Sequence, residues 1–288
     1  MSFQETIVLG ALAGFTIYVG LPFGRLQLLS ERTRVALAMF SVGVLAFLFV
    51  DVFEHAFGIV EKAVEGFKEG ERSFADASGL ALLLAAGFAS GTAGLAMVER
   101  WMRPRRRESA PAPIAGGATD AMTVDQAQAI IGEASIQRAR VLRTGMTIAV
   151  AIGLHNFAEG LAIGVSASTG EIGLATVLIV GFALHNATEG FGIVGPLGDV
   201  KPSWRWLGIA GLIGGGPTFL GSILGYNVTS EPLELAFYAV SGGAILYVIG
   251  EVWNAMRRYG HRELGLWMLS VGFVAGLVTD LVVVYGGG

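Results

Sequence analysis

Residues 81–98 read ALLLAAGFASGTAGLAMV and contain no charged side chain. The apolar core of a bilayer is about 30 Å thick and is crossed by roughly 20 residues of α-helix, so this run with its flanks is long enough to span it. Lipid offers no partners to backbone N–H and C=O groups, and a helix pairs them internally. A membrane β-strand would alternate apolar and polar residues, which this run does not do. The run therefore predicts a transmembrane helix.

The same character extends over the whole chain of 288 residues. Apolar residues make up 53% and charged residues 15%, and the mean hydropathy is +0.63. A soluble domain has about 25% charged residues. The apolar content excludes a disordered chain, the absence of cysteine excludes disulfide scaffolds and thiolate metal centres, and the net charge of −4 argues against a nucleic-acid binder. The composition indicates a polytopic membrane protein.

Eight segments have the length and hydropathy of a membrane span. We therefore expect an all-α polytopic membrane protein with eight transmembrane helices. Glu5 opens the first segment and no small-residue cleavage site follows, which favours a retained helix over a signal peptide. The expected spans lie at 5–26, 33–60, 78–98, 142–167, 172–197, 204–226, 233–256 and 264–285.

Basic residues are distributed unevenly between the two ends of these spans. Lys and Arg collect in cytoplasmic loops. All but three of the 19 basic residues fall at one set of helix ends, and the exceptions are Lys62, Lys68 and Arg72, which stand among several acids. The distribution predicts that the arginine-rich end faces the cytoplasm and that both termini are extracytoplasmic.

The longest connection divides the chain into three parts. It contains RPRRR (103–107) and then SAPAPIAGGA (109–118), which has the composition of a linker, and residues 119–140 predict a cytoplasmic helix. We interpret the arginine run as a topology anchor that touches anionic lipid, rather than as a regulatory or partner site. The expected parts are transmembrane helices 1–3 in 1–98, a partly flexible cytoplasmic loop in 99–140 and helices 4–8 in 141–288.

A hexapeptide is repeated in the fourth and fifth spans, as HNFAEG (155–160) and HNATEG (185–190). Residues four apart share one face of a helix, so each histidine stacks with its glutamate, while the asparagine points about 100° further round. An ionisable residue inside a span costs at least about 2.5 kcal/mol and is expected to serve a function. The candidate ligands are His155, Asn156, Glu159, His185, Asn186 and Glu189.

Two such helices packed together present two imidazole nitrogens and two carboxylates to one point. That is a complete ligand set for a borderline divalent ion such as Zn²⁺ or Fe²⁺, whereas Mg²⁺ and Ca²⁺ prefer oxygen ligands only. The alternative is that the His–Glu pairs merely hydrogen-bond and hold the helices together. A single pair would fit that alternative well, and a repeated pair fits it poorly.

The doublet resembles the motifs of the ZIP (Zrt/Irt-like) divalent-metal transporters, whose fourth helix carries HNxPEG. That family has eight spans, termini outside the cytoplasm and a long variable loop between helices three and four. The resemblance implies elevator-like sliding of helices 1, 4, 5 and 6 against helices 2, 3, 7 and 8. It also implies a main transport site of His155, Glu159, His185 and Glu189, with Asn156 and Asn186 at an adjacent position that the glutamates can bridge.

The chain departs from the family pattern at several positions. Ala158 and Thr188 stand where the motif has proline, and the loop lacks the family's histidines. Members with two metals use a glutamate in helix six, and Thr218 stands about where it would fall. Two amides and a hydroxyl are poor ligands for a second dication, so we predict one well-bound metal. The run GGGP (214–217) should interrupt the sixth span, and broken helices often line transport sites.

Other ionisable residues lie towards the ends of spans. We interpret Asp51, Glu54 and His55, near the outer end of the second span, as an entrance site; the alternative is that they simply face water. The resemblance makes Glu251, towards the cytoplasmic end of the seventh span, a candidate for the exit route, because the family has a glutamate at a similar place; the alternative is an ion pair with Arg257 or Arg258 at the helix end. Asp280 is expected to be solvated or structural.

The sequence predicts a multi-pass protein of a cell membrane, and of a prokaryotic inner membrane, that imports divalent metal ions. Zn²⁺ is the expected cargo, with Fe²⁺, Mn²⁺ and Cd²⁺ as alternatives. We expect no cofactor beyond the transported metal, no catalytic residues and no nucleic-acid partner; metal ions and the lipid bilayer are the expected partners, and a homodimer is left open. The rival hypotheses are an intramembrane zinc-dependent hydrolase and, more remotely, a haem-binding electron carrier.

Overall fold

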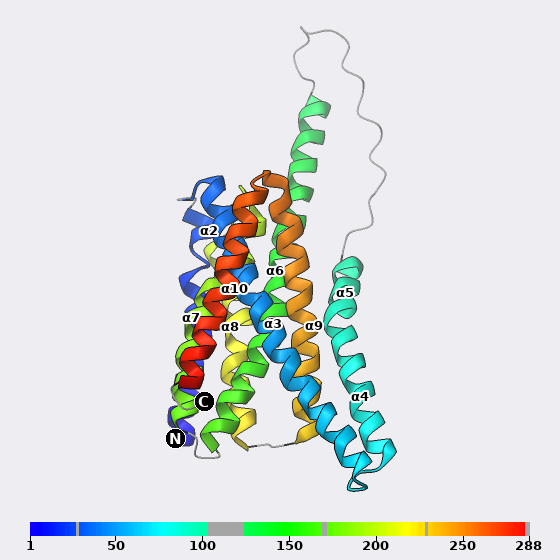
Figure 1. The fold of residues 1–288 in the computed structure, drawn as a ribbon. Helices are drawn as coiled ribbons and strands as arrows, with labels where there is room; N and C mark the ends of the chain where they lie inside the picture. The colour runs from blue at the N-terminus through cyan, green and yellow to red at the C-terminus, as the bar shows by residue number, and fades with distance from the viewer. Residues whose placement is uncertain (27–28, 103–123, 169–171, 228–229, 286–288) are drawn as a thin grey trace.

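The computed structural model describes residues 1–26, 29–102, 124–168, 172–227 and 230–285, and all regular structure within them is helical (Figure 1). The all-α fold class is therefore confirmed. The helices are α1 (Phe3–Phe15), η1 (Thr16–Val19), α2 (Phe23–Leu26), α3 (Glu31–Lys68), α4 (Phe74–Ala89), η2 (Ser90–Gly94), α5 (Leu95–Met102), α6 (Val124–Ser168), α7 (Ile172–Val194), η3 (Gly195–Leu197), α8 (Trp204–Asn227), α9 (Glu231–Met256), η4 (Arg257–Tyr259) and α10 (Arg262–Tyr285).

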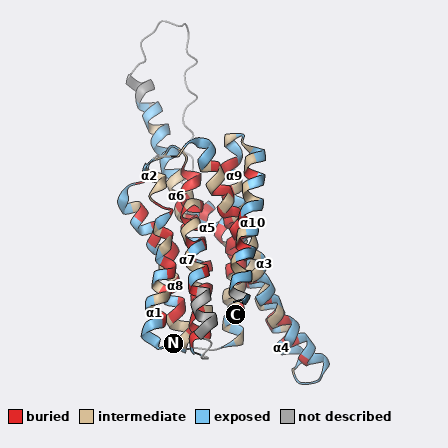
Figure 2. Ribbon diagram, turned by 60° about the vertical axis from the view of Figure 1, so that its left-hand side comes forward, coloured by how far each residue is buried: buried red, intermediate tan, exposed pale blue. Residues whose placement is uncertain are grey.

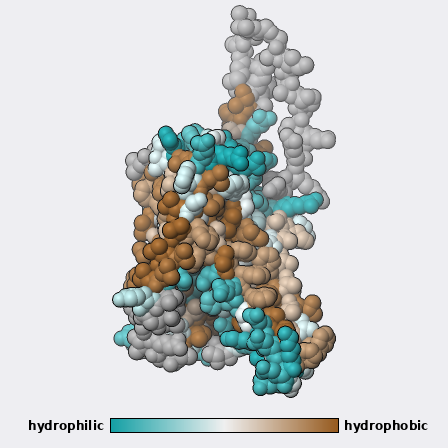
Figure 3. Space-filling model, in the orientation of Figure 1, coloured by the Kyte–Doolittle hydropathy of each residue, from teal (hydrophilic) through white to brown (hydrophobic). Residues whose placement is uncertain are grey.

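Seven helical segments of the described chain are long and apolar enough to cross a membrane. Figure 3 shows their apolar side chains as a broad zone on the body of the molecule, with hydrophilic residues gathered at its two ends. The eighth expected span corresponds to α7, part of which lies among residues whose side chains are not described, so an eighth span stays a prediction. The seven segments are Phe3–Leu26, Glu31–Lys68, Phe74–Trp101, Ile130–Ser168, Trp204–Asn227, Glu231–Tyr259 and Arg262–Val282.

The fourth expected span is part of a longer helix than the sequence suggested. α6 begins at Val124, so the cytoplasmic helix expected in 119–140 and the span at 142–167 form one helix within the described residues. Residues 124–168 contain no proline, and their polar first part is rich in helix-forming Ala, Gln, Glu and Arg. Figure 1 shows this part of α6 extending well beyond the ends of the neighbouring helices.

The expected interruption of the sixth span is wrong, because α8 continues through Pro217. Proline cannot donate to the carbonyl four residues earlier, which is that of Ile213. Helix α6 packs against this point: a side chain at Gly153 would overlap the Ile213 carbonyl oxygen, and Asn156 Nδ2 donates to the Gly214 carbonyl oxygen at 2.9 Å. Contacts from α6 thus cover the carbonyls beside the proline, and the helix stays unbroken.

The core lies where α3, α6, α8 and α9 meet. Its largest fully buried side chains include Leu45, Ile148, Ile152 and Ile245. Figure 2 shows buried residues concentrated on these inner helices, whereas α4 and α10 expose much of their outer surfaces. This distribution suits a bundle whose outer apolar surface faces lipid instead of water.

Glycines spaced four apart let neighbouring helices approach closely. Lipid supplies little hydrophobic drive between helices, so packing of small residues decides which of them associate. A side chain at Gly14 of α1 would overlap the Gly215 carbonyl oxygen of α8, and one at Gly91 of η2 would overlap the Val240 carbonyl oxygen of α9. Gly272 of α10 faces the backbone of α3 in the same way.

We predict that Gly272→Leu destabilises the protein, because the new side chain would overlap the Phe40 carbonyl oxygen. Overpacking of this kind costs about 1–3 kcal/mol. Thermal unfolding of the detergent-purified protein should show a lower midpoint. Gly58→Leu in α3 is the matched control, because a side chain there meets nothing within 4 Å; equal midpoints for both variants would contradict the packing argument.

Candidate metal centre

The structure brings three of the predicted ligands together between α6 and α7. His155, Glu159 and His185 each offer a ligand atom, and these atoms all lie within 4.8 Å of one another. His155 Nε2 is 2.9 Å from Glu159 Oε1, and the same carboxylate oxygen contacts His185 Nε2. All three residues are buried. The i, i+4 spacing in α6 and the crossing of α7 therefore produce the cluster expected from the doublet.

Glu189 completes the set from α7 but stands slightly further away. Its Oε1 atom is 3.9 Å from His155 Nε2, and its side chain is fully buried. Asn156 Nδ2 donates to Glu189 Oε2 at 3.1 Å, so the asparagine of one hexapeptide orients the glutamate of the other. Asn186 Nδ2 donates to the Ala13 carbonyl oxygen of α1 at 3.2 Å.

Several buried polar atoms of the doublet make no hydrogen bond, and the 2.9 Å approach of His155 Nε2 to Glu159 Oε1 is a close contact without hydrogen-bond geometry. Native proteins leave few such atoms, because each costs about 1–3 kcal/mol. Every one that the described residues provide belongs to the doublet or to Thr218 of α8, whose side chain lies against Gly14 of α1. Carboxylate oxygens, amide oxygens and an imidazole nitrogen are electron-pair donors that a divalent cation satisfies. The atoms are His155 Nε2, Asn156 Oδ1, Glu159 Oε2, Asn186 Oδ1, Glu189 Oε1 and Thr218 Oγ1.

A serine on α9 holds the imidazole of His155 from outside the doublet. Ser241 Oγ lies 3.0 Å from His155 Nδ1, and both residues are buried. A hydrogen bond at one ring nitrogen fixes the tautomer and orientation, which leaves Nε2 to face the cluster. The sequence analysis missed Ser241, because a lone serine in an apolar span carries no signal of its own.

A cavity of about 670 Å³ joins the cluster to the expected entrance residues. Its lining includes His155, Glu159 and His185 together with the three residues assigned to the entrance. The entrance residues are Asp51, Glu54 and His55, and Asp280 of α10 also lines the cavity. His55 Nδ1 lies 2.9 Å from the Asp51 carbonyl oxygen, so part of its hydrogen-bonding capacity is used within α3.

Two acids lie elsewhere in the bundle. Glu251 is half-buried on α9 and does not belong to the lining described for this cavity. Glu99, at the end of the apolar run in 81–98, was not singled out from the sequence. It is buried on α5, and its Oε2 atom accepts a hydrogen bond of 2.9 Å from the Tyr247 hydroxyl of α9. In the sequence, Glu99 could have been noticed only as a single acidic residue at the end of an uncharged segment.

The fold and the cluster define a helical membrane protein with a buried His–Glu site in its interior. The chain matches the family model described as ZIP Zinc transporter over residues 2–249, and it belongs to this family. It is a multi-pass membrane protein.

A curated relative gives a second comparison. The chain is 29% identical over 160 residues to the "Zinc transporter ZupT" of Clostridium perfringens (strain 13 / Type A). The aligned part covers 52% of this chain and 54% of that protein, so the match spans about half the length of the relative.

We predict that Ser241→Ala weakens metal binding without removing any ligand. Loss of a partner that orients a ligating histidine typically costs 10- to 100-fold in affinity. Competition against a zinc chelator would measure the change. Ser78→Ala is the control, because the Ser78 hydroxyl bonds only to carbonyls of its own helix; equal affinities in both variants would contradict a positioning role for Ser241.

Proposed function

We propose that the protein imports divalent transition-metal cations into the cytoplasm through the His–Glu cluster between α6 and α7. Zn²⁺ is the first candidate, with Fe²⁺, Mn²⁺ and Cd²⁺ as alternatives, and a prokaryotic inner membrane is the proposed location. The observation that carries the proposal is the buried cluster of His155, Glu159 and His185, whose ligand atoms lie within 4.8 Å of one another and which lines a cavity. Membership of the ZIP family supports transport over the hydrolase alternative.

The donor set favours a borderline cation over a hard one. Two imidazoles and two carboxylates suit Zn²⁺ and Fe²⁺, because nitrogen ligands discriminate against Mg²⁺ and Ca²⁺. The six proposed ligands of the main and adjacent positions are His155, Asn156, Glu159, His185, Asn186 and Glu189. A hydrated ion that reaches the cluster would exchange its water for these side chains.

The proposed route begins at the cavity. Asp51, Glu54 and His55 would attract a cation at the end of the bundle opposite the arginine-rich loops, and the cavity continues from them to His185. Inward movement along a membrane potential favours a dication by about 4.6 kcal/mol per 100 mV. Elevator-like alternating access would then open the site to the cytoplasm, and Glu251 is the proposed exit residue.

The proposed orientation places both ends of the chain outside the cytoplasm. The basic residues of the helix ends support it through the positive-inside rule. In Figure 1, the start of α1 and the end of α10 lie together at one end of the bundle, and the extension of α6 leaves from the other.

The decisive test is uptake of Zn²⁺, Fe²⁺ and Cd²⁺ into liposomes that contain the protein. We expect uptake by the wild type and its loss in His185→Ala/Glu189→Ala, because the double variant removes one imidazole and one carboxylate from the site. Glu133→Ala, exposed on the extension of α6, is the matched control and should transport normally.

Two results would overturn the proposal. Uptake that survives in the double variant would place the transported ion elsewhere. A wild type that moves no metal, yet retains a tightly bound zinc that the double variant loses, would make the ion structural or catalytic and bring the intramembrane hydrolase forward.

Three neutral residues suggest how many metal ions the protein binds tightly. Asn156, Asn186 and Thr218 each have a buried oxygen without a hydrogen bond, and none of the three carries a charge. A second dication next to the first needs negative charge to offset the repulsion between them. We therefore propose that the adjacent position binds metal weakly.

Thr218→Glu should raise the number of tightly bound zinc ions from one to two per chain, because it adds a carboxylate about where family members with two metals carry a glutamate. Metal analysis after desalting would measure the ratio. Thr218→Gln has the same length without the charge and should leave one ion. A wild type that already holds two ions, or a folded glutamate variant that holds one, would contradict this.

A further inference from the structure

A pair of adjoining hollows at the arginine-rich end of the bundle has no part in the proposed transport site. The first is a slot of about 130 Å³ between α3, α9 and α10, with Val35, Met39, Trp253 and Leu266 among its lining residues. The second has about 570 Å³ and a more polar lining. They share Gly260, His261, Arg262 and Leu266, so an apolar slot and a charged hollow adjoin.

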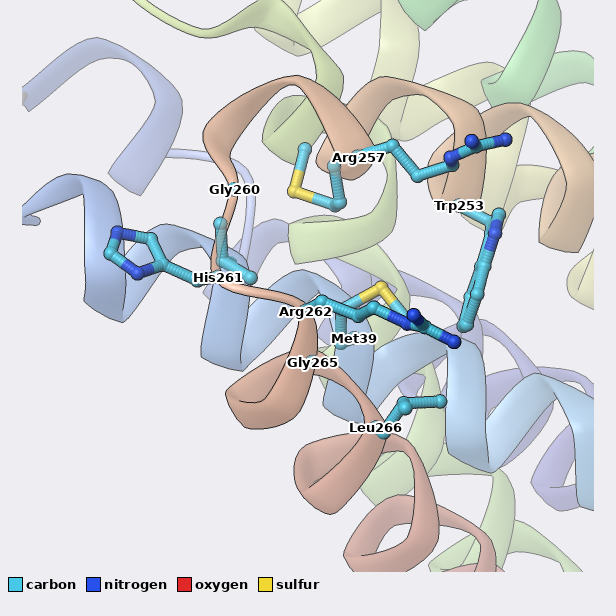
Figure 4. Close-up of a pocket in the computed structure, with 10 residues that line it drawn as sticks. Met39, Trp253, Arg257, Gly260, His261, Arg262, Gly265 and Leu266 are labelled. Carbon is cyan, nitrogen blue, oxygen red and sulfur yellow. The ribbon is translucent and has the colours of Figure 1, made fainter.

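Positive charge surrounds both hollows. Arg257 and Arg262 line the slot, and Arg32 and Arg262 line the larger hollow. Figure 4 shows Trp253 flanked by the side chains of Arg257 and Arg262, with Met39 and Leu266 beside them and His261 turned away. Cationic groups and an apolar slot therefore face the same small space.

These arginines have no carboxylate partner among the residues that the structure describes. The acids nearby are Glu31, whose Oε1 atom lies 3.6 Å from His261 Nε2, and Glu263, which lines the larger hollow. Arg32, Arg257 and Arg262 thus outnumber Glu263 around the hollows, while Glu31 faces the histidine. The first turn of α10 begins at Arg262 and adds backbone N–H groups that favour an anion.

We propose that these hollows bind an anionic phospholipid, with its phosphate held by the arginines that line them, Arg257 and Arg262, and the start of one acyl chain in the slot. Guanidinium groups recognise phosphate through paired charge-assisted hydrogen bonds. Basic pockets between transmembrane helices are suited to anionic headgroups. The lipid would join the ends of α3, α9 and α10, whose side chains form the site.

The apolar lining selects a lipid over a free anion. A phosphate ion alone would leave the slot beside Met39 and Trp253 unfilled, whereas a phospholipid buries methylene groups there. A zwitterionic lipid carries its own ammonium group, which opposes the arginines. Phosphatidylglycerol is therefore the probe of choice, because it has acyl chains that a phosphate ion lacks and has no ammonium group.

Native mass spectrometry of the full chain, with phosphatidylglycerol and phosphatidylcholine added in equal amounts, tests the site. The wild type should retain phosphatidylglycerol in preference to phosphatidylcholine. Arg257→Ala/Arg262→Ala should weaken that retention by about tenfold or more, because each substitution removes hydrogen bonds to the charged phosphate. Arg140→Ala/Arg205→Ala removes the same charge from exposed positions at the same end and should retain the lipid like the wild type.

Further measurements keep the proposal open to refutation. If the double alanine variant does not fold, Arg262→Gln decides, with a reduced preference expected. If both double variants lost phosphatidylglycerol retention equally, the preference would come from general charge attraction and not from these hollows. Displacement of the lipid by inorganic phosphate at matched concentration, or no preference over phosphatidylcholine, would also overturn the proposal.

Discussion

The arrangement of the helices around the site depends on two buried carboxylates, those of Glu159 and Glu189, whose burial the surrounding side chains must compensate. An ionised carboxylate inside an apolar bundle is costly unless positive charge and hydrogen bonds offset the loss of water. His155 and His185 contact Glu159, and Asn156 donates to Glu189, yet one oxygen of each carboxylate remains without a hydrogen bond. A bound dication would resolve this imbalance, which is the chemical reason for proposing a metal site at these carboxylates.

The packing of small residues puts the site together. α8 lies against both α1 and α6, because Gly14 leaves room for the Gly215 carbonyl and Gly160 leaves room for the Thr218 carbonyl. That approach places the buried Thr218 of α8 beside Gly14 of α1 and Gly160 of α6. Where lipid surrounds the bundle, such van der Waals contact replaces the hydrophobic drive that orders a soluble core.

The bundle separates two kinds of polar chemistry by position. Carboxylates and imidazoles line the cavity that runs from Asp51 to His185, whereas guanidinium groups surround the hollows near Trp253. The two share no lining residue, although α3, α9 and α10 contribute to both. The first place therefore favours a cation and the second an anion.

Local patterns along the chain were enough to predict the helical membrane fold and the cluster at its centre. A continuous apolar run such as 81–98 requires a helix in lipid, and the i, i+4 spacing of His155 and Glu159 places both on one face of it. The contacts between helices could not be read this way. That Ser241 bonds to His155, that Asn156 reaches Glu189, and that α8 continues through Pro217 depend on which helices lie side by side. Helical periodicity is a local property, but the partner of a buried polar atom is chosen by non-local packing, and only the tertiary structure brings those distant residues within hydrogen-bonding distance.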